Sequence, residues 1–181
     1  MPHTRIMAPF SGVMVILSSL LSAAVFGESL PTREEVLQSV YPLASQRAER
    51  VFLTREQLAD AAALAEAEIS SALLARYVLR KEGHIVGRAY VDTHQIRTKK
   101  ESLLVCLDSH GQLKRIEVTT FQEPPEYRAP ENWLHQFRGK RLDKDLRLQR
   151  AIRPLTGATL TAHSVTAAVR RVLAIDEVLE K

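Results

Sequence analysis

Two stretches of alternating apolar and polar residues limit the fold of this chain more than any other feature. Residues 77–91 alternate on both sides of a glycine-containing turn at residues 81–84, as in a β-hairpin. Residues 103–120 repeat the pattern around residues 108–111, where Gly111 can adopt the positive φ that a tight turn requires. A two-residue period places alternate side chains on opposite faces of a strand. We therefore expect an antiparallel sheet of about four strands.

Two capping signatures precede these strands, and each predicts the start of a helix. Thr32 with Glu35 begins a short apolar repeat that stops before a proline, and Thr54 with Gln57 begins a longer one that reaches Leu73. We therefore expect residues 28–75 to form an N-terminal helical segment.

Apolar residues at helical spacing return at the C-terminal end of the chain. They predict an amphipathic helix from Thr161 or Ala162 to about Leu179. Between sheet and helix, residues 123–130 are rich in proline, which cannot donate to a strand ladder, and so form a rigid loop. The expected fold class is α+β, with N-terminal helices, the sheet and a C-terminal helix.

Composition excludes several classes of protein. The chain has 181 residues, of which 45% are hydrophobic and 25% charged, as expected for a globular protein of one main domain. The net charge of +4 is spread along the chain, so no nucleic-acid footprint is evident. The His and Cys residues lack the spacing of a zinc site, and the single Cys106 lies in an apolar run, which indicates a buried, inert thiol.

The N-terminal residues differ from the rest and are typical of an export signal. His3 and Arg5 precede residues 6–27, which carry no charge and end in small residues. We expect residues 1–27 to be a signal peptide cleaved after Gly27, which would place the mature protein outside the cytoplasm, in the periplasm. The alternative is an uncleaved membrane anchor, because ~20 apolar residues suffice to span a bilayer.

A run of small and hydroxylated residues lies where the C-terminal helix begins. Unpaired N–H groups and the positive end of the helix dipole favour a phosphate at such a junction, and a glycine lets it approach the backbone. The alternative is an ordinary helix cap provided by a threonine or serine. The run consists of Thr156, Gly157, Ala158, Thr159, Leu160 and Thr161.

The Thr-Gly-Ala-Thr sequence at residues 156–159, followed by a helix rich in Val and Ala, resembles the FMN-binding domain family of exported flavoproteins. That family includes the C subunit of sodium-translocating NADH:quinone reductases and the G subunit of Rnf complexes. The resemblance covers about residues 76–181, with further matches at the Gly87 strand, the turn at residues 108–111, the Glu-Pro-Pro-Glu loop at residues 123–126 and the stretch from Trp133 to Gly139.

The resemblance implies a cofactor, its point of attachment and a partner enzyme. In the family the last threonine of the motif, here Thr159, carries FMN through a phosphoester made by a separate flavin transferase that uses FAD and Mg²⁺. Six residues before it, where the family usually has aspartate, this chain has Arg153. Tyr127 and Trp133 are candidates for an aromatic wall against the flavin, with core packing as the alternative.

The same resemblance suggests further residues that could lie near the flavin. Arg97, Arg150 and Arg153 are candidate cations near the flavin, with solvated surface charge as the alternative, and His163 is a candidate contact in the first turn of the helix. Phe137 is expected in the core.

Three functions fit these expectations. The first is an exported carrier that passes electrons between redox donor and acceptor proteins. The others are a flavin-dependent oxidoreductase that acts on a small substrate, and a module that binds FMN reversibly or has no cofactor. The sequence shows no convincing acid–base pair, which favours the carrier.

Overall fold

The computed structural model describes residues 29–181, and the predicted signal peptide lies outside them. The fold is α+β, with five antiparallel strands in the order β1-β2-β3-β4-β5, so that each strand pairs with its neighbours in sequence. The two predicted hairpins are confirmed as β2–β3 and β4–β5. The strands are β1 (Ser45–Phe52), β2 (Leu73–Lys81), β3 (His84–Gln95), β4 (Lys100–Asp108) and β5 (Leu113–Phe121).

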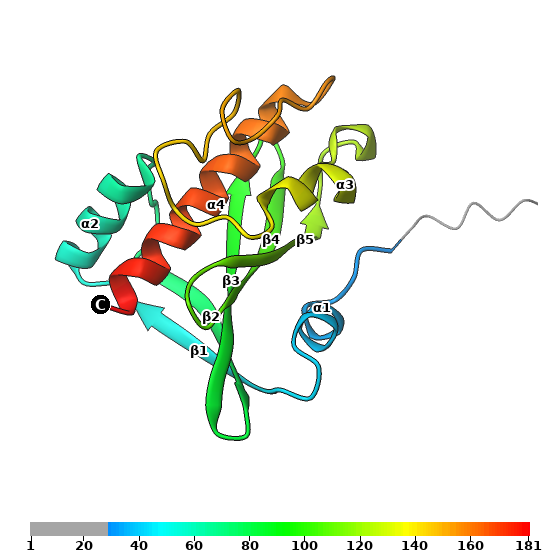
Figure 1. The fold of residues 1–181 in the computed structure, drawn as a ribbon. Coiled ribbons are helices and arrows are strands. Elements are labelled where there is room, and N and C mark those ends of the chain that lie inside the picture. The colour runs from blue at the N-terminus through cyan, green and yellow to red at the C-terminus, as the bar shows by residue number, and fades with distance from the viewer. Residues whose placement is uncertain (1–28) are drawn as a thin grey trace, which may run out of the picture.

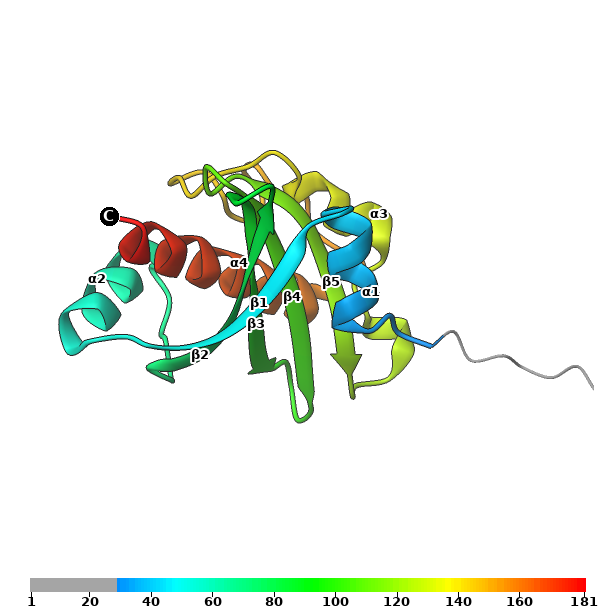
Figure 2. The same cartoon turned by 90° about the horizontal axis from the view of Figure 1, so that it is seen from below.

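The helices lie on both sides of the sheet. In Figures 1 and 2, α2 and α4 cover one face of the sheet and α1 covers the other. The helical elements are α1 (Arg33–Val40), α2 (Arg55–Ala65), η1 (Pro125–Tyr127), α3 (Glu131–Leu134), η2 (His135–Phe137) and α4 (Thr159–Leu179). Within residues 29–181, no helix has both the length and the apolar character needed to cross a membrane.

The fifth strand corrects the expected strand count and the expectation of helices alone in residues 28–75. β1 pairs with β2 from Ser45 opposite Arg80 to Phe52 opposite Leu73. It is an edge strand with few apolar residues and mostly exposed side chains, so it lacks the alternation that marks a half-buried strand.

Both capping signatures form reciprocal hydrogen-bonded caps. The Thr32 hydroxyl accepts from the Glu35 N–H at 3.3 Å, and Thr54 does the same for Gln57 at 3.1 Å. α2 is shorter than predicted, because Glu66 adopts a left-handed conformation with φ of 50° that ends the helix. Leu73, predicted to be the last apolar residue of this helix, instead begins β2.

Two hydrophobic cores explain the unbroken apolar run in β4. Leu103, Val105 and Leu107 face the larger core beneath α2 and α4, whereas Leu104 and Cys106 face the smaller core beneath α1. Because both faces of β4 are covered, alternation disappears in the centre of the sheet. Cys106 is fully buried, as predicted, and burial raises the pKa of its thiol to about 12.

Polar contacts fix the position of α4 on the sheet. Asp176 accepts from the Arg88 guanidinium at 2.5 and 2.8 Å and from the Tyr90 hydroxyl at 2.7 Å. One turn earlier, Arg171 donates to both carboxylate oxygens of Asp92 at 2.8 and 3.0 Å. These buried or half-buried pairs join the C-terminal half of α4 to β3.

Arg170 connects α4 to the irregular segment that leads into it. Its side chain is buried and donates to the carbonyl oxygens of Leu64 and Ala65 at the end of α2. It also donates to the carbonyl oxygens of Asp143 and Leu146 in the predicted charged segment. A single guanidinium therefore satisfies carbonyl groups of α2 and of this segment.

Candidate functional site

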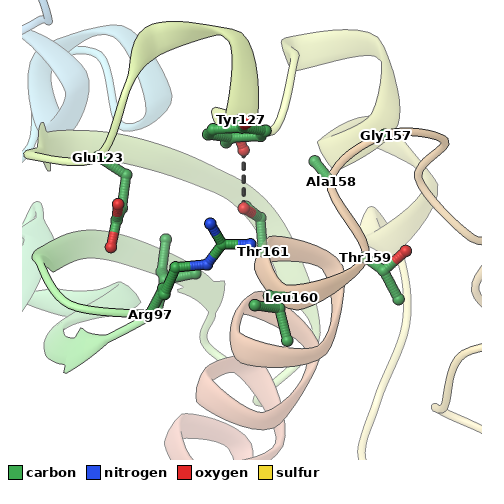
Figure 3. A pocket seen from close by; sticks show the side chains of 9 residues that line it. Arg97, Glu123, Tyr127, Gly157, Ala158, Thr159, Leu160 and Thr161 are labelled. Atoms are coloured by element: carbon green, nitrogen blue, oxygen red, sulfur yellow. Dashed lines mark hydrogen bonds between the residues drawn. The ribbon is translucent and has the colours of Figure 1, made fainter.

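A cleft forms where the start of α4 meets the ends of the central strands, and Figure 3 shows its residues. Its volume is about 220 Å³. We call it the Thr159 cleft. It is lined by Ile96, Arg97, Glu123, Tyr127, Gly157, Ala158, Thr159, Leu160 and Thr161.

The first turn of α4 supplies unpaired donors to this cleft. The helix begins at Thr159, two residues earlier than predicted, and no side chain caps it. Its first N–H groups consequently have no partner within the helix, and the positive end of the helix dipole lies among them. Gly157 has φ of 80°, a conformation that favours glycine, and there is no atom within 4 Å of the position where a Cβ would lie.

The threonines of the motif have different surroundings. Thr161 is buried, and its hydroxyl donates to the Tyr127 carbonyl oxygen at 2.7 Å, which ties the proline-rich loop to α4. Thr159 is exposed, and its side chain projects outward from the helix start, away from Tyr127 (Figure 3). Among residues 29–181 its hydroxyl has no hydrogen-bond partner, so it is accessible for chemistry.

The turn between β3 and β4 forms the opposite wall. One carboxylate oxygen of Glu123 accepts from the backbone N–H groups of Thr98 and Lys99, both at 2.8 Å, and these hydrogen bonds lower the pKa of Glu123. The turn carries Arg97, whose guanidinium carbon lies 6.0 Å from the centre of the Tyr127 ring, within cation–π range. The cleft thus contains one cation, one aromatic face and one carboxylate that binds backbone groups.

Trp133 and Arg153, both predicted to lie near the flavin, do not line the cleft. Trp133 is 8% exposed and packs edge-on against Phe137, which is fully buried as predicted. The Trp133 indole N–H donates to the Arg153 carbonyl oxygen at 2.9 Å, and the Arg153 N–H donates to the Gln136 side chain at 2.7 Å. Trp133 therefore holds the segment before α4 in place, while the Arg153 side chain is exposed.

Some of the remaining predicted residues line the cleft and others do not. Arg97 and Tyr127 line the cleft; Thr156 and His163 are exposed and do not. Arg150 forms an ion pair with Asp145 away from the cleft. Sequence analysis did not predict Ile96 or Glu123 as site residues, because the turn that brings them together becomes evident only from strand pairing.

These residues fit the phosphate end of FMN. Unpaired N–H groups at a helix N-terminus bind phosphate without any cationic side chain, and the open space beside Gly157 permits close approach. A cleft of about 220 Å³ is smaller than most pockets that enclose a whole ligand. The cleft can therefore hold only part of FMN, with the rest against its rim.

A comparison with protein families connects this geometry with a known domain. The model of the FMN-binding domain matches residues 99–174, which include every residue of the Thr159 cleft except Ile96 and Arg97. No curated protein and no solved structure matches the chain. The match is narrower than residues 76–181 but contains β4, β5, the proline-rich loop and most of α4. The start of α4 lies inside the matched region, and residues 99–174 of this chain are therefore similar to an FMN-binding domain.

Proposed function

We propose that this protein is an exported electron carrier whose FMN is attached to Thr159 through a phosphoester. The observation that carries the proposal is the position of Thr159. It is the first residue of α4, it lines the cleft, its hydroxyl is accessible, and it lies within the family match.

The other threonines of the motif are less suitable for attachment. Thr161 is 1% exposed, and its hydroxyl already donates to the Tyr127 carbonyl oxygen. Thr156 is exposed but lies before the helix and outside the cleft. Attachment at Thr159 alone combines an accessible hydroxyl with the free N–H groups of the first turn.

The attachment reaction requires a second enzyme. A threonine hydroxyl is a poor nucleophile at neutral pH, and the cleft contains no histidine or free carboxylate to act as its base. A flavin transferase with Mg²⁺ would break the phosphoanhydride bond of FAD, join the FMN phosphate to the Thr159 oxygen and release AMP, with the hydroxyl proton lost to solvent. The outward direction of the Thr159 side chain supports access by such an enzyme.

The cleft favours a carrier over an enzyme that transforms a substrate. Bound FMN supplies reversible redox chemistry. The only carboxylate in the cleft, Glu123, is held by two backbone N–H groups, and Tyr127 and Arg97 are its other ionisable residues. This set can bind and orient a flavin but contains no acid–base pair for a small substrate.

Mass spectrometry of three proteins tests the attachment. The chain is co-expressed with a flavin transferase in an exporting host and denatured, and its intact mass and in-gel flavin fluorescence are recorded. We expect a mass increase of one FMN less water in the wild type and in the control Thr156→Ala, and none in Thr159→Ala. Covalent flavin in Thr159→Ala would refute the assignment, whereas flavin lost on denaturation would indicate reversible binding.

Arg153→Asp tests whether a lack of flavin arises from poor recognition by the transferase or from a Thr159 hydroxyl that cannot accept the flavin. The contacts of Arg153 described above use its backbone N–H and carbonyl, so aspartate can replace its exposed side chain without breaking them. If the wild type is unmodified and Arg153→Asp is flavinylated, Arg153 blocks the transferase and Thr159 is a competent acceptor. If neither is modified, the proposed covalent attachment is wrong.

A further inference from the structure

Three cations of one turn lie in or beside the Thr159 cleft. Arg97, Lys99 and Lys100 are exposed in and beside the β3–β4 turn, and none of them forms an ion pair with any residue in the described part of the chain. Arg97 lines the cleft and lies over the Tyr127 ring, whereas Lys99 and Lys100 lie outside the cleft lining. This side of the cleft is therefore positively charged and open to solvent.

Carboxylates near the mouth offset these charges only in part. The two segments that flank the cleft, residues 96–100 and 122–127, contain three cations and two carboxylates: Arg97, Lys99 and Lys100 against Glu123 and Glu126. One oxygen of Glu123 faces backbone N–H groups. The positive end of the α4 dipole adds to the excess.

The carboxylates at the opposite end of α4 are paired with cations. Asp176 pairs with Arg88, Glu177 with Lys181, and Glu180 with Arg76 and Arg88. The start and end of this long helix lie on opposite sides of the molecule (Figure 1). The cations beside the cleft have no such ion pairs within residues 29–181, so the two ends of the helix differ in this respect.

Exposed apolar residues also line the cleft. Leu160 is 48% and Tyr127 37% exposed; the other exposed large apolar side chains among residues 29–181, Leu43, Phe52 and Leu73, lie elsewhere. An apolar centre with a charged rim is the usual composition of a protein interface. An opposite charge on the partner speeds encounter and orients it.

We propose that this surface, formed by Arg97, Lys99, Lys100, Tyr127 and Leu160, docks the acidic face of a redox-partner protein. The inference rests on the proposed function, because it names the partner chemistry of the same site. Docking there brings the partner to the mouth of the cleft, beside the residue that carries the flavin. Electrons then pass directly between the two proteins across the mouth.

A thiol placed at the attachment site measures the local field without flavin. Thr159→Cys is reacted with three disulfides, one dianionic (dithiobisnitrobenzoate), one neutral (hydroxyethyl disulfide) and one dicationic (cystamine). For each thiol, the rate with the anionic disulfide is divided by the rate with the neutral disulfide, so that the effect of the thiol pKa cancels. This ratio is then compared with the same ratio for the uncharged free thiol N-acetylcysteinamide. The native Cys106 is buried with its pKa raised to about 12, so it contributes no background.

The expected result is a larger ratio at the introduced thiol, which falls as salt increases. A unit charge about 10 Å away changes the rate for a dianion by about twofold to threefold at ~0.01 M ionic strength. Arg97→Gln with Lys99→Gln should therefore lower the ratio by about fivefold. Arg50→Gln with Arg55→Gln, exposed cations of β1 and α2 outside the cleft, makes the same change in net charge and should leave the ratio almost unchanged.

Electron transfer from the flavinylated protein then tests the docking role. We expect the reduced protein to react with anionic ferricyanide more slowly as salt rises and with cationic hexaammineruthenium more rapidly. The Arg97→Gln, Lys99→Gln pair should weaken both dependences. Two results would overturn the cationic docking surface even if the flavin attaches. One is a rate ratio for Thr159→Cys equal to that of the free thiol, and the other is an equal fall of the ratio in the two double variants. If flavinylation fails but the rate ratio at Thr159→Cys is high, the proposed function is wrong, while the positive electrostatic field at the cleft is established.

Discussion

His94→Gln should remove a large part of the alkaline pH dependence of stability. The His94 ring lies between two carboxylates, with Nδ1 2.8 Å from Asp92 and Nε2 3.1 Å from Glu101. Glu101 is fully buried, and its other carboxylate oxygen has no hydrogen-bond partner among the described residues. Arg171 on α4 pairs with Asp92 from the other side. A positive charge on His94 therefore compensates a buried negative one.

The magnitude follows from the pKa of His94. Burial of the ring by itself lowers this pKa, but hydrogen bonds and charge from Asp92 and Glu101 raise it from 6.5 to about 9. A group with a raised pKa stabilises the folded state below its unfolded pKa, and this stabilisation is lost as pH rises through the folded value. The full contribution is about 3 kcal/mol, of which about 2 kcal/mol is lost between about pH 7 and pH 9.

Urea unfolding of the residues 28–181 fragment at pH 6, 7, 8 and 9 measures this contribution. The difference in unfolding free energy between wild type and His94→Gln should shrink steadily as pH rises to 9. His163→Gln, at an exposed histidine of α4, serves as the control for the loss of a histidine without carboxylate partners among residues 29–181. A constant difference for His94→Gln, or one that grows with pH, would refute the reasoning.

Three further substitutions test packing and positioning around the same framework. Gly87→Ala places a Cβ against the Tyr41 ring and the Leu107 carbonyl oxygen and should lower the unfolding free energy by about 3 kcal/mol, measured by urea denaturation. Arg170→Met leaves four carbonyl oxygens without their donor and should cost about 3 kcal/mol in the same measurement. Thr161→Val removes the 2.7 Å hydrogen bond to the Tyr127 carbonyl and should cost about 1 kcal/mol while increasing hydrogen exchange in the proline-rich loop.

Each of these predictions has a control or an outcome that contradicts it. Combining Gly87→Ala with Tyr41→Ala should cost less than the sum of the two single changes, because the clash with the ring disappears while that with the Leu107 carbonyl oxygen remains; additive losses would show that the ring is not responsible. Arg170→Lys, which keeps the charge but not the fork of donors, should recover only part of the loss; full recovery would argue against the carbonyl contacts. Unchanged exchange in Thr161→Val would show that the loop is held by other contacts.

The sequence predicted much of the fold because its signals are local. Thr32 and Thr54 cap their helices with residues three positions later, and Gly111 provides the positive φ of its turn. Such signals depend only on neighbours in the chain, so they can be recognised before the fold is known. β1 was missed because a polar edge strand, paired on one side only, has no comparable pattern.

One short motif pointed to the location of the candidate site, whereas the surroundings of the site could not be predicted. The run from Thr156 to Thr161 indicated a phosphate-binding helix start, and the helix does begin within it. Trp133 was placed against the flavin by analogy, but its indole N–H has a backbone partner that brings it into the core. Aromatic residues of the core and of a ligand site look alike in sequence.

The sequence alone determined the two capped helices, the two hairpins and the presence of a C-terminal helix, since periodicity, caps and turns depend on neighbouring residues. Only the tertiary structure decided that Glu123 holds the turn carrying Arg97, that Tyr127 rather than Trp133 faces the cleft, and that His94 lies between two carboxylates. These contacts join residues of different elements or neighbouring strands. Their geometry depends on strand register and helix placement, which the packing of the whole core determines.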